Sequence, residues 1–115
     1  MSVTLRELLE TPLLKGITVL AGHRGLDRRV TSVTVLDAPD GVNWLQGGEL
    51  VITSGYIFRD DPRSLIPVID TLQSRGMSCF GIKVSRYIGK VPDEVLRHAD
   101  ELGFPLLDIP FPFAF

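Results

Sequence analysis

The sequence has few of the residues that metal centres and disulfide frameworks need. Among its 115 residues there are one cysteine, Cys79, and two histidines, His23 and His98. A lone cysteine excludes a disulfide within the chain and is typical of a reducing compartment, so we expect a cytoplasmic protein. The histidines lie far apart and share no ligand-like spacing with Cys79. We therefore expect neither a metal nor another cofactor.

Long apolar runs and a strong net charge are also missing. No run reaches the roughly 18 apolar residues of a membrane span, and the first residues do not resemble a secretory signal, so we expect no membrane partner. Twelve basic and fourteen acidic residues give a formal net charge of −2. Because nucleic-acid surfaces are usually basic and clustered, the scattered Lys and Arg residues predict no specific DNA binding by this chain.

The chain is long and apolar enough to form one domain with its own core. Its 44% share of hydrophobic residues suits a single packed domain over residues 1–115. The C-terminal end is unusual, because Phe111, Phe113 and Phe115 crowd an open terminus. Apolar residues at a free end need cover, so we expect this tail to lie against the domain or a second copy of it. We also expect the chain to be a piece of a longer protein.

The segment from Trp44 to Gly55 organises the rest of the chain. Leu50–Ile52 lacks polar alternation, which predicts a strand buried on both faces at the centre of a sheet. Gly47–Glu49 forms the turn before this strand, with Glu49 able to cap or pair there. Phosphate-binding loops follow a strand and open a helix, so the reversed order here disfavours a nucleotide loop.

The order of the predicted elements indicates an α/β fold. The second half of the chain alternates strictly between strands and helices, which favours parallel strands with right-handed crossovers. We predict a single small domain with a mostly parallel sheet of about five strands flanked by helices. The predicted strands are 17–21, 30–36, 50–52, 79–84 and 106–109. The helices are predicted to begin at residues 5, 65 and 92, with a possible helical turn at 42–45 and a loop at 86–91.

Several helix ends can be predicted from capping residues. Thr4 and Glu7 have the spacing of a capping box. Ser64 as N-cap places Pro67 in the first turn, where the missing N–H costs nothing, whereas a start at Pro62 would require a kink. Pro92 suits the first helical position of the last helix, because that position needs no N–H donor.

Polar residues follow three of the predicted strands where each strand ends. Asp37 follows the second strand, Thr53, Ser54 and Gly55 follow the third, and Lys83 lies near the end of the fourth. Ligands gather at the carboxyl ends of strands in open α/β sheets, so these residues could bracket a small polar ligand. The alternative is a solvated sheet edge with ordinary capping hydroxyls.

Other polar groups favour structural interpretations. Cys79 begins a buried strand without a thiolate-stabilising neighbour, which indicates a structural cysteine. His98 reads as a histidine on a helix surface. Arg28 and Arg29 could bind an anion or a partner, but a surface turn with a local pair to Asp27 is the simpler interpretation.

These residues together resemble the N-terminal domain of PucR-type transcriptional regulators, the purine catabolism regulator-like family. The resemblance covers nearly the whole chain, and its most specific signals are Gly25-Leu26-Asp27-Arg28 followed by Gly47-Gly48-Glu49-Leu50. It implies a regulatory module. Such regulators typically carry a middle domain and a C-terminal helix-turn-helix domain that binds DNA. Neither occurs here, so DNA would be a partner only through a C-terminal domain absent from this sequence.

Three functions remain open at this point. The first is a non-catalytic sensory domain of a bacterial transcription factor that binds a small metabolite or self-associates as a homodimer through a sheet edge or the tail. The second is an oligomerisation module without a ligand. An enzyme ranks last, because the sequence offers no acid–base pair, nucleophile–base pair or metal set.

Overall fold

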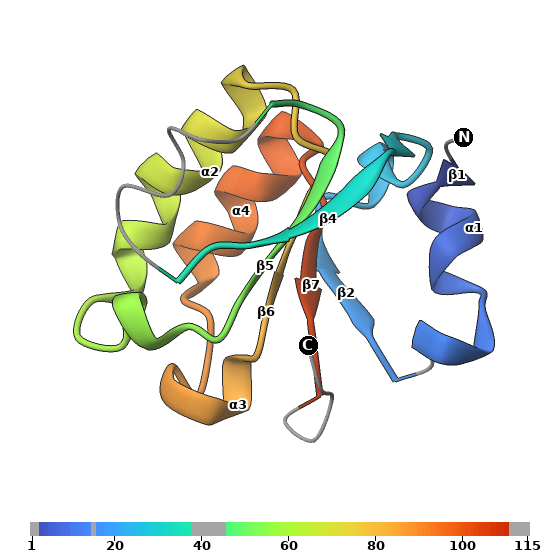
Figure 1. Cartoon of the computed structure of the whole chain (residues 1–115). Coiled ribbons are helices and arrows are strands. Elements are labelled where there is room, and N and C mark those ends of the chain that lie inside the picture. Colours follow the sequence, from blue (N-terminus) through green and yellow to red (C-terminus); the bar gives the residue numbers. More distant parts are fainter. Residues whose placement is uncertain (1–2, 15, 38–45, 111–115) are drawn as a thin grey trace.

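The computed structural model describes residues 3–14, 16–37 and 46–110. Its main feature is a five-stranded sheet in the order β2-β7-β6-β5-β4 (Figure 1). Strands β4 to β7 run parallel to their neighbours, and β2 pairs antiparallel with β7. The mostly parallel α/β fold is thereby confirmed. The strands are β2 (Thr18–Ala21), β4 (Ser32–Val35), β5 (Glu49–Thr53), β6 (Cys79–Ile82) and β7 (Leu106–Asp108).

Helices cover the two faces of the sheet unequally. The long helices α2 (Leu65–Ser74) and α4 (Asp93–Leu102) pack on one face, and the short α1 (Leu5–Leu9) lies on the other face, beside β2 (Figure 1). A two-stranded ribbon pairs β1 (Val3–Thr4) with β3 (Arg29–Val30). Short helical segments complete the connections: η1 (Pro12–Leu14), η2 (His23–Gly25), η4 (Tyr56–Phe58), η5 (Pro62–Ser64) and α3 (Val84–Tyr87).

The strand at the centre of the sheet is β6, not β5 as the sequence predicted. All four residues of β6 are buried, and β5 is second from the edge. Within β5, Val51 is fully buried against the helices α2 and α4, as expected. Ile52 is only partly buried, because it points to the other face, where α1 covers the far end of the sheet.

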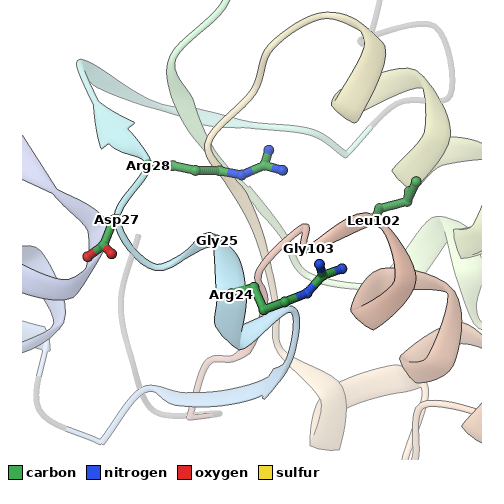
Figure 2. Close-up of a pocket in the computed structure, with 6 residues that line it drawn as sticks. All are labelled: Arg24, Gly25, Asp27, Arg28, Leu102 and Gly103. Atoms are coloured by element: carbon green, nitrogen blue, oxygen red, sulfur yellow. The ribbon is translucent and has the colours of Figure 1, made fainter.

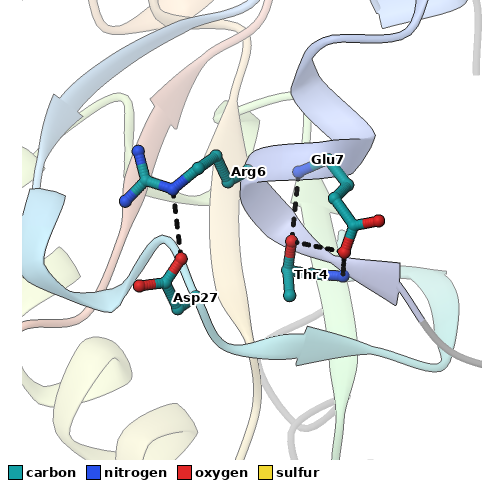
Figure 3. A network of polar contacts seen from close by, with 4 residues as sticks. All are labelled: Thr4, Arg6, Glu7 and Asp27. Atoms are coloured by element: carbon teal, nitrogen blue, oxygen red, sulfur yellow. Dashed lines mark hydrogen bonds and ion pairs between the residues drawn. The ribbon is translucent and has the colours of Figure 1, made fainter.

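The predicted helix ends are largely confirmed. The Thr4 hydroxyl accepts from the Glu7 N–H at 3.1 Å, and the Glu7 carboxylate accepts from the Thr4 N–H at 3.2 Å (Figure 3). Ser64 is the N-cap of α2, so Pro67 lies in its first turn. The helix α4 begins at Asp93, one residue later than predicted, and Pro92 occupies the N-cap position.

Other differences are local. The strand predicted at 79–84 ends at Ile82, and the loop predicted at 86–91 overlaps the end of α3. The strand predicted at 30–36 divides into β3 and β4. The possible helical turn at 42–45 and the tail at 111–115 lie outside the described residues. Within residues 3–14, 16–37 and 46–110, no helix has the length and apolar character to cross a membrane.

Candidate functional site

Three of the predicted ligand-binding residues contact one another at the carboxyl edge of the sheet. Asp37 Oδ1 accepts hydrogen bonds from the Thr53 hydroxyl at 3.2 Å, the Ser54 N–H at 3.0 Å and the Ser54 hydroxyl at 3.1 Å. Asp37 follows β4 and Thr53 ends β5, so parallel pairing brings the two strand ends together. The other oxygen, Oδ2, makes no hydrogen bond to the described residues, so the described contacts orient the carboxylate through one oxygen.

Thr53 and Gly55 shape the turn that presents Ser54. The Thr53 hydroxyl accepts from the Gly55 N–H at 3.1 Å, and both residues are buried. Gly55 has φ +90°, and a Cβ there would come within 3.2 Å of Ile88 Cδ1. Both residues are therefore parts of the scaffold. Ser54 is half-buried and Asp37 is exposed, so these two side chains can reach a ligand.

Lys83 lies beside this cluster as predicted. It follows β6 directly, only 7% of it is exposed, and its backbone N–H donates to the Thr53 carbonyl at 3.2 Å. Lysine is seldom buried, and a buried lysine normally has its charge paired. A mostly buried lysine therefore follows β6 directly, next in the sheet to the strand that ends at Thr53.

The structure adds Asp108, which the sequence analysis missed. Asp108 ends β7 and pairs in register with Ile82, the residue before Lys83. Burial raises the pKa of the Asp108 carboxyl above its ordinary value, while a backbone hydrogen bond from Val84 lowers it to a smaller extent. An acid inside the apolar run Leu106–Ile109 was the signal that could have identified it. A carboxyl that is partly removed from water can protonate more readily than an exposed one.

An aromatic pair borders the same edge. The rings of Tyr56 and Tyr87 lie 5.1 Å apart, edge to face, and both are exposed. The Tyr56 N–H donates to Ser54 Oγ at 3.4 Å, and the Arg59 guanidinium stands 3.6 Å from the centre of the Tyr56 ring. Exposed tyrosine rings beside polar groups suit contact with a flat polar molecule.

The histidines and the cysteine have structural surroundings. Cys79 is fully buried, and burial raises the pKa of its thiol, which keeps it neutral and supports the predicted structural role. His98 on α4 contacts Asp70 on α2, with 2.6 Å between Nε2 and Oδ1. In the part of the chain that the structure describes, no three His, Cys, Asp or Glu residues are grouped to hold a metal ion.

The opposite, amino edge of the sheet is organised by the turn at residues 22–28. Arg24 Nη2 donates to the carbonyls of Asp100 at 2.8 Å and Glu101 at 2.9 Å, which lie at the C-terminal end of α4. The Gly22 N–H donates to Asp100 Oδ1 at 2.7 Å. At Gly25 a Cβ would lie 2.1 Å from the Gly103 carbonyl oxygen, so only glycine fits this close approach. The turn thus caps α4 and packs on the chain that leads into β7.

The sequence predicted a local ion pair between Asp27 and a following arginine. For Arg28 this prediction is wrong. Asp27 Oδ1 instead pairs with Arg6 Nε on α1 at 3.1 Å (Figure 3). Arg28 Nη1 donates to the Met77 carbonyl at 3.2 Å, and its guanidinium lies 5.2 Å from the centre of the Phe104 ring. The side chains of Asp27 and Arg28 therefore point to opposite sides of the turn, because their partners lie on different parts of the fold.

By its fold, the chain is a small α/β domain with a mostly parallel sheet and polar side chains gathered at the carboxyl ends of the strands. It belongs to the purine catabolism regulatory protein-like family, PucR, whose profile matches residues 7–115. It is 34% identical over 104 residues to the purine catabolism regulatory protein of Bacillus subtilis (strain 168). That alignment covers 90% of this chain and 20% of the relative, so the chain spans about a fifth of the relative's length. Membership in a family of regulators supports a regulatory role.

Proposed function

We propose that this chain is a non-catalytic sensory domain of a transcription regulator, which binds a small polar metabolite at the carboxyl edge of its sheet. The observation that carries the proposal is the Asp37 carboxylate, which Thr53 and Ser54 hold through Oδ1 while Oδ2 makes no hydrogen bond to the described residues. The half-buried Ser54 adds a hydroxyl from the neighbouring strand end, and the mostly buried Lys83 follows the next strand. A few convergent polar groups at such an edge are typical of a binding site.

The chemistry of this edge favours a flat molecule with N–H donors. An oriented carboxylate oxygen accepts from N–H groups, and the partly exposed rings of Tyr56 and Tyr87 border the same edge, with Arg59 stacked on Tyr56. The name of the B. subtilis relative connects that protein with purine catabolism. Purines and their breakdown products are therefore the first compounds to test on this chain.

The proposed mechanism is a shift between two states of the regulator. A metabolite that binds one state more tightly changes the populations by its difference in affinity, and no chemistry on the ligand is required. We assign DNA binding to a C-terminal domain outside these residues, as the family resemblance implies. The ligand would act on that domain through the end of β7, which leaves the carboxyl edge next to Asp108.

A thermal-shift screen tests this function. A ligand present at about 100 times its dissociation constant stabilises the domain by about 2.7 kcal/mol, which raises the melting temperature by on the order of 10 °C. Asp37→Asn should weaken binding about tenfold or more, because the charged acceptor is lost. Asp60→Asn is the matched control, since Asp60 is exposed and lies in the turn after η4. The proposal fails if no purine or breakdown product shifts the transition, or if both variants respond alike.

Self-association through β4 is a second candidate, supported by the position of β4 as an edge strand among the described residues. Val33 and Val35 are 58% and 51% exposed, and residues 31–36 contain neither a charge nor a proline to block pairing. The Leu36 N–H donates to the Ile52 carbonyl at 2.7 Å. Because backbone groups alternate in direction along a strand, those of Val33 and Val35 point away from β5. A second copy of β4 fits there, antiparallel about Thr34, with Val33 of one copy opposite Val35 of the other.

Sedimentation at tens of micromolar distinguishes this candidate. The chain should sediment as a dimer, and Val35→Lys should return it to a monomer because charged side chains block edge pairing. Thr18→Lys places the same charge at an exposed position on β2, the opposite edge strand, and should leave the dimer intact. A monomeric parent chain, or a dimer that survives Val35→Lys, contradicts pairing through β4.

A further inference from the structure

A hollow lies at the amino edge of the sheet, on the side opposite the proposed metabolite site. It has a volume of about 420 Å³ and is open to solvent, and we call it the amino-edge hollow (Figure 2). Its lining residues come from the turn after β2 and from the end of α4: Arg24, Gly25, Asp27, Arg28, Leu102 and Gly103. The volume is within the range of about 300–1,000 Å³ that small-molecule sites occupy.

Two guanidinium groups reach into this region, and both are held by uncharged acceptors. Arg24 donates through Nη2 to the carbonyls of Asp100 and Glu101, at 2.8 and 2.9 Å. Arg28 donates through Nη1 to the Met77 carbonyl at 3.2 Å. A guanidinium has five N–H donors. Nε and Nη2 of Arg28 make no hydrogen bond to the described residues, and these two atoms form a two-pronged contact with a carboxylate or phosphate. Arg24 uses Nη2 for the carbonyls, so its Nε and Nη1 can each make a single contact.

No acidic side chain in the described residues neutralises either arginine. The ion pairs of residues 3–14, 16–37 and 46–110 involve Arg6, Arg63 and His98. The only acid in the lining, Asp27, points away from the two guanidiniums toward α1 and pairs there with Arg6 (Figures 2 and 3). Two arginines thus outnumber the one acid among the lining residues, and that acid is paired with Arg6, so the hollow has an excess of positive charge.

Partial burial strengthens the attraction of Arg28 for an anion. Arg28 stacks 5.2 Å from the centre of the Phe104 ring, and its removal from water lowers the pKa of its guanidinium below the ordinary value, although an arginine stays charged at neutral pH. A charge that has lost part of its hydration gains more from an opposite charge than an exposed one does.

We propose that the amino-edge hollow binds a small organic anion through a carboxylate or phosphate group held between Arg24 and Arg28. The backbone contacts fix both side chains before the anion arrives, so little side-chain entropy is lost on binding. Gly25 and Gly103 also line the hollow, so their backbone N–H groups report on an anion that enters it. This site is separate from the carboxyl-edge site and does not depend on it.

An NMR titration of the ¹⁵N-labelled chain tests the anion site. Sodium phosphate and sodium succinate are added in parallel, with sodium chloride at matched ionic strength as reference. We expect phosphate or succinate, but not chloride, to shift the amide signals of Gly25 and Gly103 along a saturable curve. Arg24→Gln should weaken the binding about tenfold, because it removes one charged donor. Arg97→Gln makes the same change at an exposed position on α4 and should leave the affinity unaltered.

Arg28→Lys is a second variant that distinguishes loss of binding from loss of folding. It keeps the positive charge but loses the forked geometry of the guanidinium donors. It should keep the amide spectrum of the parent chain yet bind the anion more weakly. Saturable shifts at Gly25 and Gly103 that weaken only in the Arg24 and Arg28 variants support the proposal. It is overturned if phosphate and succinate act no differently from chloride, or if Arg97→Gln weakens binding as much as Arg24→Gln. Shifts near Asp37 alone would place the anion at the other edge and would also overturn it.

Discussion

Replacing Gly25 with alanine should destabilise the fold much more than replacing Gly89, although only Gly89 has a positive φ. A Cβ at Gly25 would lie 2.1 Å from the Gly103 carbonyl oxygen and 2.8 Å from Pro105 Cδ. Both atoms belong to the segment between α4 and β7. One is a backbone oxygen and the other is part of the proline ring, so neither can move aside by a side-chain rotation. Overpacking costs about 1–3 kcal/mol when side chains can adjust, so we expect a loss of about 3 kcal/mol or more here.

Gly89 provides the matched control for this prediction. Its φ is +79°, and a Cβ there would meet nothing within 4 Å, so Gly89→Ala costs only the left-handed conformation, about 1–2 kcal/mol. Urea unfolding followed by circular dichroism measures both. With a slope of about 1.5 kcal/mol per M, a 3 kcal/mol loss lowers the midpoint by about 2 M. If Gly25→Ala costs less than about 1 kcal/mol, or no more than Gly89→Ala, the close approach of the turn to α4 is wrong.

Three further predictions concern the core, the carboxyl edge and DNA. Ile69→Ala should cost about 2–5 kcal/mol in urea unfolding, because Ile69 is fully buried, and Ile52→Ala should cost less, because Ile52 is partly exposed. Equal losses would contradict the unequal cover of the two faces. Burial raises the pKa of Asp108, so the folded state holds that proton more tightly, and stability falls as pH rises above the ordinary value of 3.8. Asp108→Asn should therefore stabilise the chain, relative to the parent, more at pH 7 than at pH 3; an equal effect at both would refute this. A gel-shift assay at physiological salt should show no sequence-specific retention of DNA at submicromolar protein, since the net charge is −2.

Local patterns in the sequence were sufficient for much of the fold. The capping box at Thr4 and Glu7 and the position of Pro67 predicted two helix starts, because caps involve residues within one turn of each other. Strict alternation of strands and helices predicted the parallel sheet, and parallel strands end at the same edge. The contact between Asp37 and Ser54 is consistent with that expectation, although the two residues are 17 positions apart. Whether they bind a ligand remains a prediction.

The order of strands and the partners of charged side chains were decided only by the tertiary structure. An apolar run shows that a strand is buried but not which strands are its neighbours, so β5 was assigned to the centre that β6 occupies. Asp27 was expected to pair with the arginines that follow it in sequence, yet it pairs with Arg6. Arg28 instead donates to a carbonyl 49 residues away. Long side chains find partners in space, and the close approach of Gly25 to Gly103 depends in the same way on how α4 docks on the turn. The sequence by itself determined the elements and the kinds of residue at their ends, whereas packing of segments distant in sequence determined which of those residues meet.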